Sequence, residues 1–301
     1  MGNENGYRRN AIFRQKIAMN PKDITLCSFT GVYDGQTNLK AAASRSIDCR
    51  DISSTDCYCD DEAVAAIQAK IAGVSVNGIH FFDSGNYHYM SKLWTDKIQE
   101  PFNLLVFDHH PDMQPPRFEG ILSCGGWVKE VLEKNGFVQK VVVVGVADKL
   151  IKELKGDEAT EFSKFEDRIE FIAESEIREG DIAGNDIACS PFTAGSPLAA
   201  DEQVIEKLAI RIKKLLSQDC PLYISIDKDV LRKEDAATNW DQGSMSVQML
   251  CDCLQALCNT TPILGVDICG ERGRDMDYTK AAAADALNEK ASLAILKSLG
   301  S

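Results

Sequence analysis

The chain has 301 residues, of which 44% are hydrophobic and 26% charged, and its formal net charge is −13 at pH 7. This composition is that of an ordinary globular protein, and the negative charge disfavours nucleic acid or an anionic membrane surface as the partner because like charges repel. We find no apolar run of roughly 18 residues that predicts a membrane span, and the N-terminal residues lack the apolar core of a secretory signal. Eleven cysteines without an export signal predict reduced thiols in a cytoplasmic protein.

Short β-branched or aromatic runs alternate with amphipathic segments along the chain. Strands are expected at 24–29, 46–52, 78–83, 102–108, 140–147, 168–173, 221–227 and 262–268. Helices are expected at 60–71, 124–136, 201–218, 246–258 and 280–299, and long irregular loops at 175–200 and 232–243. This alternation predicts an α/β fold in one domain over 1–301, a three-layer α/β/α sandwich whose mainly parallel sheet has about eight strands.

Two C-x-C pairs, Cys57/Cys59 and Cys251/Cys253, invite a metal interpretation. Residues two apart on a helix point in different directions, and structural zinc sites usually have a longer spacing than C-x-C. Core packing is therefore the preferred interpretation of both pairs.

Polar side chains follow four of the expected strands, at the edge where parallel sheets bind ligands. They are His88; Asp108, His110 and Asp112; Asp227 and Asp229; and Asp267 with Glu271. Each alone is commonly a turn or capping residue. In an extended chain, however, alternate residues face the same side, so Asp108, His110 and Asp112 can converge while His109 faces away.

The chemistry of this set favours a divalent cation. Carboxylates with imidazoles are too rich in oxygen for structural zinc and too rich in nitrogen for calcium, and they suit Mn²⁺ or a comparable ion. The set exceeds what one ion needs, so two ions that share bridging carboxylates are expected, in a site that favours a small cationic ligand.

Three motifs resemble those of the arginase and agmatinase family, the ureohydrolases. The family's D-A-H-x-D resembles residues 108–112, its S-x-D-x-D resembles 225–229, and its G-G-D-H resembles 85–88. The resemblance implies an arginase-like fold, a homo-oligomer (trimer or hexamer) and two Mn²⁺ per chain. One ion would bind His88, Asp108, Asp112 and Asp227, and the other His110, Asp108, Asp227 and Asp229.

The activity that the resemblance implies is hydrolysis of a guanidine or amidine C–N bond in a small cationic substrate. A metal-bridging hydroxide would attack the guanidinium carbon and release urea or a related product. Asp112 would carry the proton to the leaving amine, and Glu271 would hold the guanidinium and stabilise the intermediate.

The sequence departs from the family around the substrate. Cys124-Gly125 stands where the family has His-Gly, and the late D-x-x-E motif is one residue longer here, ending at Glu271. A cysteine at a helix N-terminus is expected to have a depressed pKa, which makes Cys124 a candidate for proton transfer, with simple packing as the alternative. Trp127, Arg232 and Trp240 are candidates to flank the pocket, with packing or surface charge as the usual explanation.

Two other functions stay open at this stage. One is a formiminoglutamase-like hydrolase acting on a related substrate. The other is a metal-binding arginase-fold protein whose catalysis is lost or altered and which serves as a binding or regulatory subunit.

Overall fold

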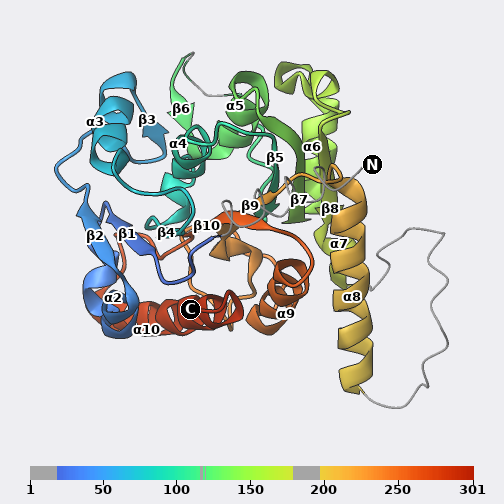
Figure 1. Ribbon diagram of the computed structural model, residues 1–301. Coiled ribbons are helices and arrows are strands. Elements are labelled where there is room, and N and C mark those ends of the chain that lie inside the picture. Colours follow the sequence, from blue (N-terminus) through green and yellow to red (C-terminus); the bar gives the residue numbers. More distant parts are fainter. Residues whose placement is uncertain (1–18, 116–117, 119, 179–196) are drawn as a thin grey trace, which may run out of the picture.

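A computed structural model describes residues 19–115, 118, 120–178 and 197–301. At its centre lies an eight-stranded sheet in the order β2-β1-β4-β10-β9-β5-β7-β8, in which every pairing is parallel (Figure 1). Its strands are β1 (Ile24–Ser28), β2 (Arg45–Asp48), β4 (Ile79–Phe81), β5 (Phe102–Phe107), β7 (Val138–Val146), β8 (Ile169–Ala173), β9 (Leu222–Asp227) and β10 (Ile263–Cys269). Each of the eight predicted strand segments overlaps one of them, so the strand predictions are confirmed apart from their bounds.

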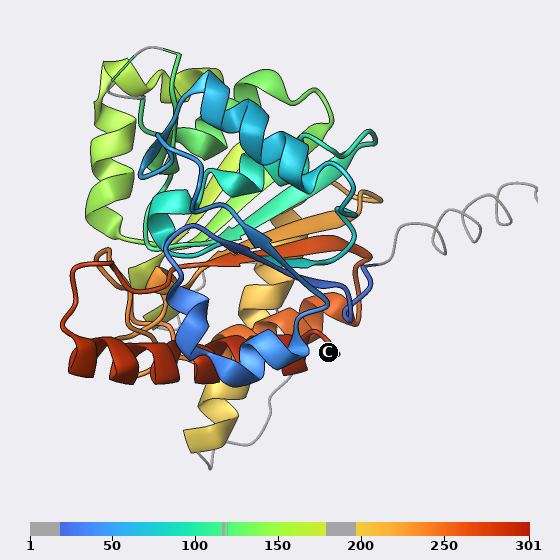
Figure 2. The same cartoon turned by 90° about the vertical axis from the view of Figure 1, so that its left-hand side faces the viewer.

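Helices cover both faces of this sheet (Figures 1 and 2). One face carries α3 (Asp61–Ile71), α4 (Met90–Thr95), α5 (Trp127–Lys134) and α6 (Asp148–Gly156), and the other carries α2 (Thr37–Ala42), α7 (Glu174–Arg178), α8 (Pro197–Leu215), α9 (Val247–Cys258) and α10 (Tyr278–Ser298). The expected three-layer α/β/α sandwich is confirmed. In the described part of the chain, no helix is long and apolar enough to cross a lipid bilayer.

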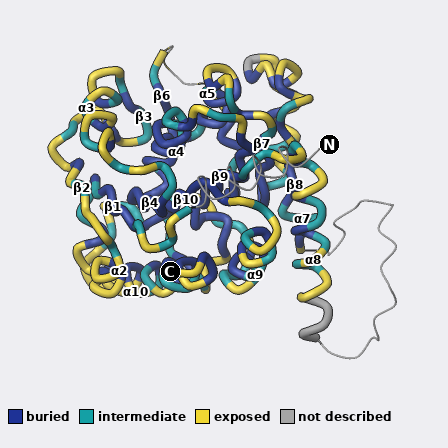
Figure 3. The backbone as a smooth tube through the Cα atoms, in the orientation of Figure 1, coloured by how far each residue is buried: buried dark blue, intermediate teal, exposed yellow. Residues whose placement is uncertain are grey.

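The continuous apolar runs of the central strands follow from burial on both faces (Figure 3). In β5, Leu105 and Phe107 pack into the core under one helical layer, whereas Leu104 and Val106 pack into the core under the other. Both sets are fully buried, which explains the continuous apolar run from Leu104 to Phe107.

The irregular segment expected at 175–200 is shorter than predicted. Residues up to Arg178 belong to α7, and α8 already begins at Pro197. Side chains stabilise the start of α7, because Glu176 accepts a hydrogen bond from the Ala173 amide (3.0 Å) and the Ser175 hydroxyl donates to Asp148 (2.6 Å). Residues 179–196 lie outside the described residues. The loop at 232–243 contains neither helix nor strand, as predicted.

A second, two-stranded antiparallel sheet was not predicted. It pairs β3 (Tyr58–Cys59) with β6 (Leu122–Ser123). Strands of two residues carry no periodic signal, so only the fold brings these segments together. This small sheet forms one wall of the site described next.

Candidate metal centre

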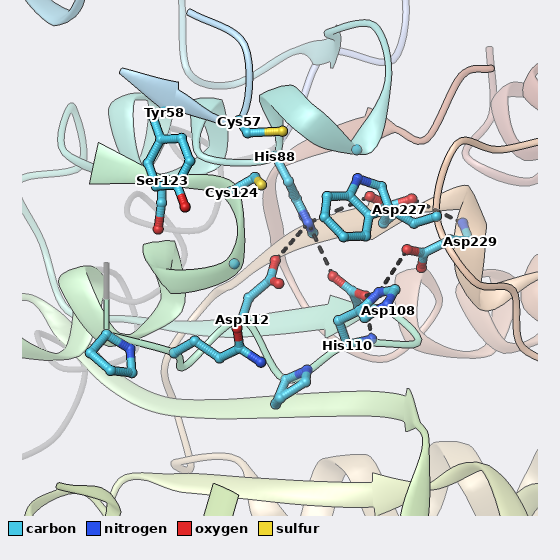
Figure 4. Close-up of a pocket in the computed structure, with 16 residues that line it drawn as sticks. Cys57, Tyr58, His88, Asp108, His110, Asp112, Ser123, Cys124, Asp227 and Asp229 are labelled. Atoms are coloured by element: carbon cyan, nitrogen blue, oxygen red, sulfur yellow. Dashed lines mark hydrogen bonds and ion pairs between the residues drawn. The ribbon is translucent and has the colours of Figure 1, made fainter. Parts of the chain in front are cut away.

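The polar residues that follow β4, β5 and β9 meet at the carboxyl edge of the sheet (Figure 4). These strands and β10 are neighbours at the centre of the sheet, so their carboxyl ends place the attached loops side by side. The loops line a cavity of about 250 Å³. All six predicted metal ligands line it: His88, Asp108, His110, Asp112, Asp227 and Asp229.

His88 directs one ring nitrogen at the carboxylates. Its Nδ1 lies 3.0 Å from Asp108 Oδ2, 3.0 Å from Asp112 Oδ2 and 3.7 Å from Asp227 Oδ2. The other nitrogen, Nε2, lies 2.9 Å from the Ser225 hydroxyl, which fixes the orientation of the ring.

His110 faces the same carboxylates from the opposite side. Its Nδ1 lies 2.9 Å from Asp229 Oδ2 and 3.4 Å from Asp108 Oδ1. Asp108 therefore presents Oδ2 to one imidazole and Oδ1 to the other. His109 is not among the lining residues, as predicted; its backbone amide donates to Asp229 Oδ1 (3.1 Å).

Asp112 occupies a strained backbone conformation, with φ at 47°. Its carboxylate accepts a hydrogen bond from Trp127 Nε1 (2.6 Å), and its carbonyl accepts one from the Val128 amide (3.1 Å). Non-glycine residues with positive φ cost free energy and are concentrated at functional sites. The sequence interpretation of Trp127 as a packing residue missed this hydrogen bond.

Asp227 is held by the chain around it. Its Oδ1 accepts from the Asp229 amide (2.9 Å) and its Oδ2 from the Cys269 thiol (3.2 Å). A Cβ at Gly270, where φ is 89°, would lie 2.3 Å from Asp227 Oδ1, so only glycine fits there. The backbone at Gly270 thus passes directly beside this carboxylate.

The surroundings of these groups shift their pKa values upward, which favours their protonated forms. Burial, and then the negative charges of Asp229 and Asp108, raise the pKa of Asp227 to about 7. Burial opposes protonation of His110, but its hydrogen bonds to Asp108 and Asp229 outweigh this and raise its pKa to about 12. Burial likewise opposes protonation of His88, whose pKa is raised well above its usual value by Asp108 and Asp112. Divalent ions would replace these protons.

Glu271 is not brought into this cavity. It forms a fully buried ion pair with Lys228, and both side chains are 0% exposed. Its second oxygen accepts hydrogen bonds from Gln36 Nε2 (2.8 Å) and Asn288 Nδ2 (2.9 Å). Because protein groups already engage both oxygens, the geometry does not support the role in substrate binding expected for Glu271. Sequence reasoning could not foresee that Lys228 would reach it.

Cys124 lines the cavity, but the depressed pKa expected for it is wrong. Its hydrogen bond with Cys57, its burial and the negative charge of Asp112 all raise the pKa of this thiol above its usual value. Cys57 also lines the cavity, whereas Cys59 packs into the core as expected. The remaining lining residues that sequence reasoning did not select include Tyr58, Gln114 and Ser123.

Comparisons with known proteins bear on the fold. No family model matches the chain. An uncharacterized protein of Thermotoga maritima is 28% identical over 281 residues, which are 93% of this chain and 91% of that protein. Among solved structures, the agmatine ureohydrolase of Thermoplasma volcanium superimposes with a TM-score of 0.61 at 11% identity, over 96% of this chain and 97% of that one.

Two further structures are similar. The native arginase of Bacillus caldovelox matches with a TM-score of 0.54 at 15% identity, over 90% of this chain and 98% of that one. A Trypanosoma cruzi formiminoglutamase solved with Mn²⁺ matches with a TM-score of 0.56 at 14% identity, over 91% and 93% of the two chains. The chain has the ureohydrolase fold. The resemblance seen in the three motifs is thus confirmed at the level of the fold, and the six clustered residues lie on a ureohydrolase scaffold.

Proposed function

We propose that this ureohydrolase-fold protein is a binuclear manganese-dependent hydrolase of a guanidine or amidine C–N bond. The observation that supports it most is the position of Asp108, which directs one carboxylate oxygen at His88 and the other at His110. A carboxylate in this position suits a bridging ligand between two ions.

The donor set fits two such ions. Four buried carboxylates face two imidazoles, and no lysine or arginine is among the described residues that line the cavity. Mixed oxygen and nitrogen donors suit Mn²⁺. We propose His88, Asp108, Asp112 and Asp227 as the ligands of one ion and His110, Asp108, Asp227 and Asp229 as those of the other.

In the proposed hydrolysis, the ions would activate water and side chains of the protein would transfer the proton. Bound ions of this kind lower the pKa of water and supply hydroxide near neutral pH. Asp112 lies at the cavity surface, where its carboxylate can accept a proton from the attacking water and pass it to the leaving amine. Trp127 fixes the orientation of that carboxylate through its Nε1 hydrogen bond.

The cavity favours a small cationic substrate. Its volume of about 250 Å³ is at the small end for ligand sites. Trp240 lies at the cavity in edge contact with His110, with ring centroids 5.7 Å apart, and an indole attracts a cation through its π face. Since Lys228 neutralises Glu271, a guanidinium would be bound by the carboxylates of the metal centre and by the indole.

The test is product release from the Mn²⁺-loaded protein with arginine, agmatine, guanidino acids and formiminoglutamate. Urea and formamide are measured in parallel. We expect one substrate to give product, and we expect Asp227→Asn to abolish both turnover and tight metal binding because it removes a bridging charge. Asp241→Asn, which changes an exposed carboxylate of the loop at 232–243, is the matched control and should retain activity.

The outcomes separate the alternatives. Formamide rather than urea would identify a formiminoglutamase-like activity. Two bound ions with no product from any substrate would favour the binding or regulatory subunit. Turnover by Asp227→Asn near the wild-type rate would contradict the proposed mechanism.

A further inference from the structure

The two thiols on the cavity wall lie directly opposite each other. In the small antiparallel sheet, Tyr58 pairs with Ser123 and Cys59 with Leu122, so Cys57 and Cys124 flank the paired strands at the same end. The Cys124 amide donates to the Cys57 carbonyl at 2.9 Å, which holds the two backbones together just beyond the strands. The two thiols are close enough for each to shift the pKa of the other.

This arrangement suits a disulfide. A disulfide needs Cα atoms about 4.4–6.8 Å apart, and the backbone hydrogen bond between Cys124 and Cys57 keeps the two backbones close enough for this range. Both cysteines are unpaired in the structure. From the backbone hydrogen bond, the position of both residues at one end of the small sheet and their shared place on the cavity wall, we infer that Cys57 and Cys124 form a reversible oxidation site that takes a hydroperoxide as its oxidant.

Access distinguishes this pair from the other described cysteines. Cys57 is partly exposed and both thiols border the cavity, beside His88 in Figure 4, so a small oxidant that enters the cavity reaches them. Cys27 and Cys49 are 0% exposed. Cys220 and Cys258 are also partly exposed, but neither lines the cavity, and Cys258 lies on α9 in the layer on the opposite face of the sheet.

Oxidation of the two thiols to a disulfide takes two steps. The Cys57 sulfur attacks one oxygen of the hydroperoxide, the O–O bond breaks, and a sulfenic acid forms while water or an alcohol leaves. The Cys124 sulfur then attacks the sulfenic sulfur, the S–O bond breaks and water leaves. The two thiols lose two electrons and two protons in total, and the hydroperoxide is reduced. A dithiol reductant reverses the reaction.

The bond would join β3 to β6 across a wall that also contains Asp112. Oxidation would therefore fix the shape of the cavity next to a proposed metal ligand. The inference about the disulfide itself does not depend on the proposed hydrolase activity, and its test does not use turnover.

The experiment treats the full-length protein with hydrogen peroxide, alkylates the remaining thiols and maps the peptides by mass spectrometry. We expect a Cys57–Cys124 linked peptide that has lost two hydrogens, that forms at least about tenfold faster than any other cysteine product, and that disappears on treatment with dithiothreitol. Cys124→Ser should prevent the link and leave a Cys57 sulfenic acid that dimedone traps.

Cys258→Ser is the control and should leave the yield of the linked peptide unchanged. The inference is overturned if both thiols stay free while Cys258 is oxidised. It is also overturned if Cys57 is oxidised to the sulfinic acid in the wild-type protein without any link to Cys124.

Discussion

Asp108 presents one carboxylate oxygen to each of two imidazoles, and this single side chain connects the two halves of the candidate centre. At the scale of residues, the neighbours that orient the ligands matter as much as the ligands. Ser225 orients His88, the backbone amide of His109 holds Asp229, and Trp127 orients Asp112. Removing one such neighbour should impair chemistry without removing a ligand.

Trp127→Phe tests this expectation. It deletes the Nε1 hydrogen bond to the Asp112 carboxylate. A hydrogen bond to a charged group is worth about 1.5–3 kcal/mol, so we expect turnover to fall about tenfold or more, with Mn²⁺ still bound. Trp94→Phe is the matched control, because Trp94 is also fully buried but its Nε1 has no partner in the described part of the structure. Equal loss in both variants would show that packing, rather than the hydrogen bond, is responsible.

The raised pKa of Asp227 predicts a pH dependence for the metal-free protein. Its folded pKa, about 7, exceeds the ordinary value of 3.8, so the folded state binds the proton more tightly than the unfolded state. The free energy of unfolding should therefore fall as pH rises between these two values, and bound Mn²⁺ should abolish the fall. Urea unfolding of the metal-free wild type and of Asp227→Asn, at pH values between these two pKa values, measures this change in the free energy of unfolding. The same pH dependence in both metal-free proteins would contradict the assignment.

At the scale of elements, the buried Lys228–Glu271 pair connects the turn after β9 to the turn after β10. Lys228 lies between Asp227 and Asp229 in the chain, so the pair supports the turn that carries both carboxylates. Removing one partner of a buried ion pair leaves an uncompensated charge and costs about 3–5 kcal/mol.

We expect Lys228→Met and Glu271→Gln each to destabilise the protein by about this amount, and the double variant to be less destabilised than the sum. Urea unfolding of the two single variants and the double variant measures the coupling. Lys149→Met is the control, since its pair with Glu153 is largely exposed and should contribute less than about 1 kcal/mol. Additive losses in the double variant would mean that the two charges do not support each other.

At the scale of the whole molecule, the sequence predicted what local patterns determine. Short β-branched or aromatic runs predicted all eight strands of the main sheet, and D-x-H-x-D with D-x-D predicted the clustered residues. The surroundings of Glu271, Cys57 and Cys124 could not be predicted, because they depend on contacts between segments that are distant in the chain. Neither the burial of Lys228 against Glu271 nor the pairing of two-residue strands has a recognisable local sequence pattern. The trimer or hexamer expected from the resemblance stays a prediction.

The most direct test of the account is a crystal structure of the Mn²⁺-loaded protein, with anomalous differences measured at the manganese absorption edge. We predict two peaks about 3.5–4 Å apart, as in other two-metal sites, with the Asp108 carboxylate between them and one imidazole, His88 or His110, on each. A single peak, or two peaks that do not share Asp108, would contradict the binuclear centre.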